Sequence, residues 1–315
     1  MIHENYRKKG YLISKKILKK DDILSMRNDL DLEFSDEESN AKLLHDFKNE
    51  KLIKKIISLY KHDILKNIKN ELIKISDSNL TLLPHFIIQK NYHVDLKQFH
   101  GWHRDCAGEL IYDYCKNIHY SKNYFFSKVG FYLQENTEYG GSIDVIKTSH
   151  KHFSKFKTFF RKIKIIPFKI ITLVHKHFRN FYNIIPESFF MFLLNAKRLY
   201  PEPGSAVIFD YRLLHRGSPI SKKKLKEINF KKGHYQAVTS KDQTKYSIYC
   251  HLGTRDAVDS YFFDRLKRSD NFSKNELKTW IDQIDFISKY DNELSKEMSK
   301  LFSPIMEKYQ KVQQI

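Results

Sequence analysis

The chain has 315 residues, of which 41% are hydrophobic and 14% aromatic, a composition that excludes a disordered chain. Its 10 glycines and 7 prolines are too few for a collagen-like or low-complexity protein. Basic residues outnumber acidic ones by 56 to 37, and the net charge of +19 favours an anionic partner such as nucleic acid, acidic lipid or a phosphorylated substrate.

Most of this charge falls in two segments of the chain. Residues 150–203 carry a net charge of +9, and residues 219–245 carry a net charge of +6. Runs of lysine are often no more than solvated surface. The alternative is a pair of basic loops that flank a site, and the sequence leaves both interpretations open.

Cysteine content and the N-terminus bear on location. Cys106, Cys115 and Cys250 form no CxxC motif, and an odd count in a long chain suits a reducing compartment better than a disulfide framework. The first residues lack the apolar segment of a signal peptide, and no run of about 18 apolar residues occurs. We therefore expect a cytoplasmic protein without a transmembrane segment. Peripheral contact with an anionic membrane stays open.

In chain order, the first elements are a strand and several helices. Residues 10–14 predict a short strand, and residues 21–32 predict a helix that Asp21 or Asp22 could cap. Residues 41–75 carry apolar side chains at helical spacing, which predicts two or three amphipathic helices.

The middle of the chain changes character. Between about residues 84 and 255, short β-branched and aromatic runs bounded by turn residues predict an antiparallel set of strands. Residues 150–203 interrupt this set. Phe153, Phe156 and Phe160 lie there at helical spacing with basic residues between them, so we expect a helical insertion.

The C-terminal part, about residues 271–315, has the pattern of helices. Ser273 and Glu276 have the spacing of a capping box at the start of a helix, and Pro304 is expected to break the last one. The layout predicts one domain over residues 1–315. Its fold class would be mainly β with flanking helices.

The string FHGWHRD carries the most chemical information. His103 and Asp105 are two residues apart, so on an extended segment an imidazole and a carboxylate point to the same side. The best third ligand is His215, which follows an apolar strand and precedes a turn. Two neutral imidazoles and one carboxylate on one face of a metal make the facial triad of non-haem Fe(II) oxygenases.

Three blocks resemble the phytanoyl-CoA dioxygenase family of Fe(II)/2-oxoglutarate-dependent oxygenases: WHRDCAGE, KVGFYLQENTEYGGSIDVIKTSHK and PGSAVIFDYRLLHRGSP. The resemblance extends over roughly residues 10–255. It implies a double-stranded β-helix (jelly roll) core with Fe(II) at His103, Asp105 and His215. It also implies 2-oxoglutarate as cosubstrate and O2 as oxidant, with succinate and CO2 as products. Because the carboxylate Asp105 is present, hydroxylation or another oxidation is favoured over halogenation.

The anchor for 2-oxoglutarate departs from the family pattern. The resemblance implies an arginine about ten residues after the distal histidine, at the start of the next strand. Here residues 219–240 look like an insertion, and the next strand begins with Lys245, which is our first choice. Arg216 and Arg255 are the alternatives, although Arg216 would point away from His215 on an extended segment.

Four further residues are weaker candidates. Tyr132 and Gln89 (or its neighbour Lys90) lie on predicted strands and could line the 2-oxoglutarate pocket, but ordinary strand positions explain them as well. Trp102 adjoins His103 and could pack under the metal or wall the substrate cavity. Gln98 precedes the metal motif and could contact substrate.

The sequence therefore predicts an oxygenase that hydroxylates a small or carrier-linked anionic metabolite, such as a cell-surface glycan or natural-product precursor. The alternative is a basic protein that binds a membrane surface or nucleic acid on an oxygenase-like fold. The aromatic and basic run FSKFKTFFRKIKIIPFKII suits an interfacial helix, whereas no nucleic-acid module signature occurs. A zinc hydrolase is disfavoured because the HExxH motif is absent.

Overall fold

The computed structural model describes most of the chain outside the basic segments. The described residues are 2–35, 41–76, 79–91, 93–95, 102–105, 124–135, 140–151, 187–218, 236–238, 244–266 and 270–313. Within them, no helix combines the length and the apolar character needed to cross a membrane.

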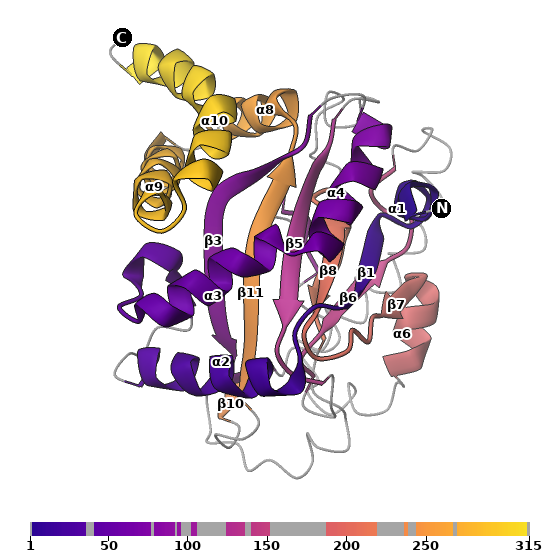
Figure 1. Cartoon of the computed structure of the whole chain (residues 1–315). Helices are drawn as coiled ribbons and strands as arrows, with labels where there is room; N and C mark the ends of the chain where they lie inside the picture. The colour runs from indigo at the N-terminus through magenta and orange to yellow at the C-terminus, as the bar shows by residue number, and fades with distance from the viewer. Residues whose placement is uncertain are drawn as a thin grey trace.

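A six-stranded antiparallel sheet forms the centre of the molecule (Figure 1). Its longest strands lie side by side in the middle of the sheet, where both neighbours supply backbone hydrogen bonds. In spatial order the strands are β1 (Tyr11–Lys16), β8 (Ser205–Asp210), β5 (Phe126–Tyr132), β11 (Lys245–Gly253), β3 (Thr81–Asn91) and β2 (Ala41–Leu43). We call this the major sheet.

A smaller antiparallel sheet packs against one face of the major sheet. Its strands are β7 (Ala196–Arg198), β6 (Ile143–Ile146) and β9 (His215–Gly217), in that order. Val207 and Phe209 of the major sheet share an apolar cluster with Ile143 and Val145 of this minor sheet. A separate pair joins β10 (Gln236–Val238) to β4 (His93–Asp95).

Helices cover the other face of the major sheet. In Figure 1, α2 (Lys20–Glu33), α3 (Glu50–Lys61) and α4 (Asp63–Ser76) lie in front of the long strands, and the C-terminal helices gather beside β3. One core cluster contains buried side chains from these helices and from the strands of the major sheet, and its members range in sequence from Tyr6 to Tyr309. The remaining helices are α1 (Ile2–Lys9), the short 3-10 helix η1 (Leu44–Asp46), α6 (Glu187–Leu193), α8 (Arg255–Leu266), α9 (Asp270–Ser288) and α10 (Asn292–Gln313).

The alternation of side chains along β11 gives the major sheet its two environments. Tyr246, Ile248 and Cys250 join the core under the helices. Ser247 lies directly opposite Tyr132 of β5, and Tyr132 belongs to the cluster between the sheets. Because alternate residues of a strand face opposite sides, Ser247 and Tyr249 point toward the minor sheet.

Several sequence expectations are corrected here. The fold is a mixture of helices and antiparallel sheet rather than mainly β, because long helices cover a whole face of the major sheet. Residues 41–43 form a strand paired to β3, although they continue a helical pattern. Helix α2 begins at Lys20 after the N-cap Lys19, so Asp21 and Asp22 lie in its first turn and cap nothing.

The C-terminal helices also differ from expectation. Pro304 does not break the last helix but lies inside α10, where Phe302 and Ile305 are buried on either side of it. Burial of apolar side chains along the whole helix outweighs the backbone hydrogen bond that a proline removes. Helix α9 already begins at Asp270, so Ser273 lies within it rather than at its N-cap.

The predicted insertion at residues 150–203 lies largely outside the described residues. Its described C-terminal part contains helix α6, as expected, and then the strand β7. That strand was not predicted, because three residues are too few to show an alternating pattern.

Candidate metal centre

Backbone hydrogen bonds hold the two predicted histidine ligands opposite each other. The amide of His103 donates to the carbonyl of His215 at 2.9 Å, and the amide of His215 donates to the carbonyl of His103 at 3.0 Å. Such a pair of opposed residues in an antiparallel bridge points its side chains to one side. Asp105, two residues further on, lies close to both imidazoles.

The three side chains converge on one point. Nε2 of His103 lies 3.5 Å from Oδ1 of Asp105, and Nε2 of His215 lies 3.8 Å from Oδ2. One ligand atom from each of the three residues lies within 4.8 Å of the others. Among the described residues, this is the only group of three or more potential ligands arranged to hold a metal ion. The structure thus brings together the three residues that the sequence analysis selected as a triad.

Asp105 is present as a carboxylate. Burial opposes its ionisation, but the Lys128 ammonium and the hydrogen-bonding His103 imidazole outweigh burial and hold its pKa well below the usual range. Nζ of Lys128 lies 3.4 Å from Oδ2, an ion-pair contact that lacks hydrogen-bond geometry. Oδ2 is consequently buried without a hydrogen bond from the described residues. A buried carboxylate oxygen in that state suits coordination to a cation.

His215 is held in the form that a metal requires. Its Nδ1 lies 2.9 Å from the carbonyl oxygen of Leu213, which fixes the proton on Nδ1 and leaves the Nε2 lone pair facing Asp105. Burial lowers the pKa of His215 to about 4, with partial opposition from the Asp105 charge. The imidazole is therefore neutral at physiological pH.

These observations fit a divalent metal ion. The donor set is two imidazole nitrogens and one carboxylate oxygen, and each buried ligand is in its coordinating form. The His103 side chain is 40% exposed, whereas those of Asp105 and His215 are 11% and 5% exposed. The site is therefore open on the His103 side, where a small molecule could enter.

Lys128 is a site residue that the sequence analysis missed. It comes from the middle of β5, and its ammonium lies 4.9 Å from the ring centroid of Tyr249 as well as beside Asp105. The signal was present in the sequence, because Lys128 alternates with Gly130 and Tyr132, and Tyr132 was already a candidate for the 2-oxoglutarate pocket.

Three of the proposed 2-oxoglutarate residues share the face of the major sheet that looks toward the minor sheet. Ser247 pairs with Gln89 on one side and with Tyr132 on the other, so these side chains form a row across three strands. Lys245 is two residues from Ser247 and lies on the same face. Lys90, the alternative to Gln89, points to the opposite face, where its Nζ donates to the carbonyl of Phe34.

Lys245 lies within the protein interior at the start of β11. Its exposed fraction is 8%, and burial lowers its pKa to about 8. The ammonium is therefore charged at neutral pH but easily deprotonated. A buried lysine of this kind is suited to binding an anion.

Arg216 and Trp102 lie on the side facing away from the three ligands. The Arg216 guanidinium pairs with buried Asp144 at 2.9 Å and stacks over the Trp102 ring at 4.8 Å. Since Trp102 and Arg216 are the neighbours of the bridged histidines, alternation carries both away from the metal. The structure thus does not bring Arg216 to the ligands, and Trp102 supports the bridge from behind.

The remaining candidates are distant or not described. Arg255 begins α8, beyond the end of β11 opposite to Lys245, a separation of about 25 Å along the strand. Gln98 lies outside the described residues, as do most of residues 150–203 and 219–245. Whether the basic segments flank the site stays a prediction.

Comparisons with known proteins find similarity only among solved structures. No family model matches the chain, and no curated protein matches it. AviO1 from Streptomyces viridochromogenes Tue57 is 11% identical with a TM-score of 0.44, over 80% of this chain and 93% of that one. EvdO2 from Micromonospora carbonacea var. aurantiaca, in complex with 2-oxoglutarate, is 12% identical with a TM-score of 0.41, over 80% and 89%.

EctD from S. alaskensis, with 2-oxoglutarate and 5-hydroxyectoine, is 12% identical with a TM-score of 0.44, over 81% of this chain and 76% of that one. Because these TM-scores lie below 0.5, we take neither a family nor an activity from the similarities. The function is therefore argued from the site itself.

Proposed function

We propose that this protein is an Fe(II)/2-oxoglutarate-dependent oxygenase. The observation that carries the proposal is the convergence of His103, Asp105 and His215 within 4.8 Å, with a carboxylate and a neutral imidazole in coordinating form. Three protein ligands on one side of the metal leave positions for a chelating cosubstrate and for O2.

The arrangement of strands supports a jelly-roll core for this enzyme. Along the chain, β3, β5, β8 and β11 belong to the major sheet, whereas β6, β7 and β9 belong to the minor sheet and the His103 bridge extends it. Strands that pass back and forth between two facing antiparallel sheets are typical of jelly rolls. The ligands come from the minor sheet and its extension, and the lysines come from the major sheet.

The side chains divide the work of catalysis between them. Bound Fe(II) with 2-oxoglutarate would supply the activation of O2 needed to oxidise a C–H bond. His103, Asp105 and His215 would hold the metal. Lys245 would pair with the distal carboxylate of 2-oxoglutarate, and Tyr132 and Gln89 would line the same pocket from β5 and β3. The carboxylate of Asp105 favours hydroxylation or another oxidation over halogenation.

The substrate class follows from charge. Lys128 carries a positive charge next to the ligands, and the site is open beside His103. We therefore propose a small or carrier-linked anionic substrate, attracted further by the basic residues 150–203 and 219–245 if these flank the opening. No described feature favours the alternative of a membrane-surface or nucleic-acid binding protein, since its basic aromatic run lies outside the described residues.

The experiment that tests the proposal measures metal content and cosubstrate turnover. Purified protein loaded anaerobically with Fe(II) should bind one iron per chain and convert 2-oxoglutarate to succinate under O2. Asp105→Ala and His215→Ala should lose most of the iron and all turnover, while the control His62→Ala, on a surface segment between α3 and α4, should retain both. Iron content equal to wild type in His215→Ala would exclude the triad.

A further inference from the structure

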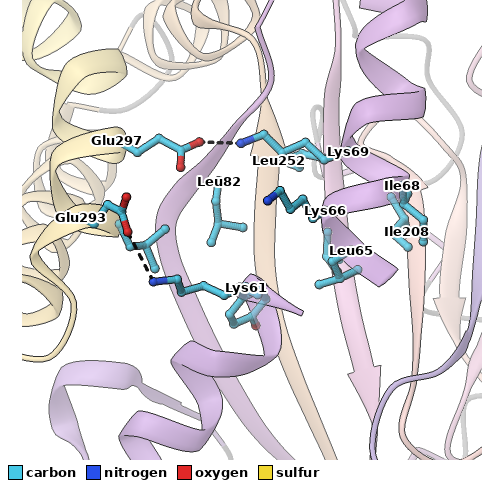
Figure 2. Close-up of a pocket in the computed structure, with 13 residues that line it drawn as sticks. Lys61, Leu65, Lys66, Ile68, Lys69, Leu82, Ile208, Leu252, Glu293 and Glu297 are labelled. Atoms are coloured by element: carbon cyan, nitrogen blue, oxygen red, sulfur yellow. Dashed lines mark hydrogen bonds and ion pairs between the residues drawn. The ribbon is translucent and has the colours of Figure 1, made fainter. Parts of the chain in front are cut away.

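A cavity lies on the opposite face of the major sheet from the metal ligands. It has a volume of about 470 Å³ and lies between α3 and α4 on one side and α10 on the other, above β3, β11, β5 and β8 (Figure 2). That volume is within the range of small-molecule sites. Its floor and inner wall are aliphatic, and the residues are Leu65, Ile68, Leu82, Val129, Ile208 and Leu252.

Several side chains that line the cavity remain slightly accessible to solvent. Ile68, Leu82 and Leu252 keep 7%, 9% and 6% of their surface accessible, whereas Ile88 and Ile248, on the same strands as Leu82 and Leu252, are fully buried. The aliphatic side chains therefore line an open space instead of packing against one another. Apolar surface of this kind is stabilised by an apolar ligand that displaces water.

Ion pairs between the helices hold the cavity walls. Lys61 at the end of α3 pairs with Asp291 at 2.8 Å, and Lys69 of α4 pairs with Glu297 of α10 at 2.5 Å. Figure 2 shows the second pair bridging the opening from α4 to α10. Lys61 also lies 3.8 Å from Glu293 of α10, so the positive charges of these two lysines are balanced by three carboxylates.

Lys66 differs from its two neighbours. It lies one turn from Lys69 on α4, and in Figure 2 its ammonium points toward the centre of the cavity, with no dashed line to a carboxylate. Its ammonium makes neither an ion pair nor a hydrogen bond with the described part of the chain. Lys66 is thus the one of these three lysines whose ammonium has no carboxylate partner in the described part of the chain, and its side chain is exposed at the mouth. An ammonium at the edge of an aliphatic cavity complements a ligand that has an apolar chain and one anionic group.

We propose that this cavity binds a free single-chain carboxylic acid, with the chain over the aliphatic floor and the carboxylate on Lys66. The site would be independent of the metal centre, since it lies on the other side of the major sheet. The cavity nevertheless lies close to the metal centre along the strands. Val129 and Ile208 of the floor adjoin Lys128, which contacts Asp105, and Phe209, whose ring centroid lies 4.7 Å from that of His215.

The test uses decanoate as the probe and isothermal titration calorimetry as the measurement. Wild-type protein should bind one decanoate per chain. Lys66→Gln should weaken binding by about 10-fold or more, since it removes a charge-assisted hydrogen bond. Leu65→Trp, which fills the cavity from a partly exposed position on α4, should abolish binding. Lys51→Gln, which removes an exposed lysine from α3, is the matched control and should bind as wild type.

Two further titrations distinguish a carboxylate site in this cavity from unspecific adsorption of an apolar chain and from binding at the metal centre. Decyltrimethylammonium, with the same chain and the opposite charge, should not bind. Asp105→Ala should bind decanoate as wild type, so a failed metal centre would leave this proposal standing. Absence of decanoate binding to wild type, or binding that survives both Lys66→Gln and Leu65→Trp, would overturn it. Binding to anionic vesicles without any binding of decanoate would overturn it in favour of a membrane surface.

Discussion

Two lysines place positive charge on the inner side of the major sheet, and their roles can be separated by experiment. Lys128 lies 3.4 Å from the Asp105 carboxylate, next to the proposed iron. Its ammonium repels a divalent cation but attracts a dianionic cosubstrate. We therefore expect Lys128→Met to bind Fe(II) at least as tightly as wild type, while the iron-loaded variant binds 2-oxoglutarate roughly 10-fold more weakly.

Anaerobic titrations of the iron and then of 2-oxoglutarate measure the two affinities independently. Lys197→Met is the matched control, since Lys197 is exposed on β7 of the minor sheet, and both affinities should stay at the wild-type value. A loss of iron affinity in Lys128→Met would mean that the lysine supports the metal ligands rather than the anion.

Lys245 offers a test by pH. Burial lowers the pKa of its ammonium to about 8, so the charged form is present below that pH and is lost as the pH rises through it. If the ammonium holds the distal carboxylate, affinity for 2-oxoglutarate should be constant near pH 7 and fall by at most about tenfold per pH unit above 8.

The conservative variant decides whether Lys245 is responsible. Lys245→Arg keeps its charge at pH 9 because the guanidinium has a pKa above about 12, so its affinity should change little over this range. Titrations of 2-oxoglutarate at several pH values give both profiles. The same alkaline loss in wild type and Lys245→Arg would assign the pH dependence to another group.

At the scale of the elements, close packing between β5 and β11 positions the aromatic residues of the site. A Cβ atom at Gly130 would lie 2.6 Å from the Tyr249 ring, which also contacts the Lys128 ammonium. Gly130→Ala should therefore displace Tyr249 and lower the free energy of unfolding by about 1–3 kcal/mol.

Gly217 supplies the control for this substitution. It lies on β9, close in sequence to His215, yet a Cβ atom there would meet nothing within 4 Å. Chemical denaturation of Gly217→Ala should give a stability close to wild type. Equal stabilities for the two variants would show that β5 and β11 can separate without cost.

At the scale of the whole molecule, one core cluster joins the first and last helices. It includes Tyr6 of α1, Trp280 of α9 and Tyr309 of α10, together with strands of the major sheet. We therefore expect residues 1–315 to unfold as a single cooperative unit. The chain has two tryptophans, so Trp102→Phe leaves Trp280 as the only one.

Thermal unfolding of Trp102→Phe followed by fluorescence would then report on the C-terminal helices. Circular dichroism would report on all the secondary structure. The two midpoints should coincide. A separate transition for Trp280 would show that the C-terminal helices form an independent unit.

Residues and elements with strong local signals could be predicted from the sequence. An H-x-D spacing on an extended segment and a histidine at the end of an apolar strand made His103, Asp105 and His215 candidates, because alternation along a strand depends only on local geometry. The resemblance of the flanking blocks to a known family was needed to select them. The strands β1, β5, β8 and β11 and the helices α3 and α4 were likewise visible as patterns of period 2 or 3.6.

Features that depend on contacts between distant segments could not be predicted from the sequence. The bridge between His103 and His215, the ion pair of Lys128 with Asp105, and the pairing of residues 41–43 with β3 all join residues far apart in the chain. Pro304 stays inside a helix for the same reason, because burial on both sides outweighs a local preference. Local sequence encodes the direction of a side chain, and packing determines what that side chain meets.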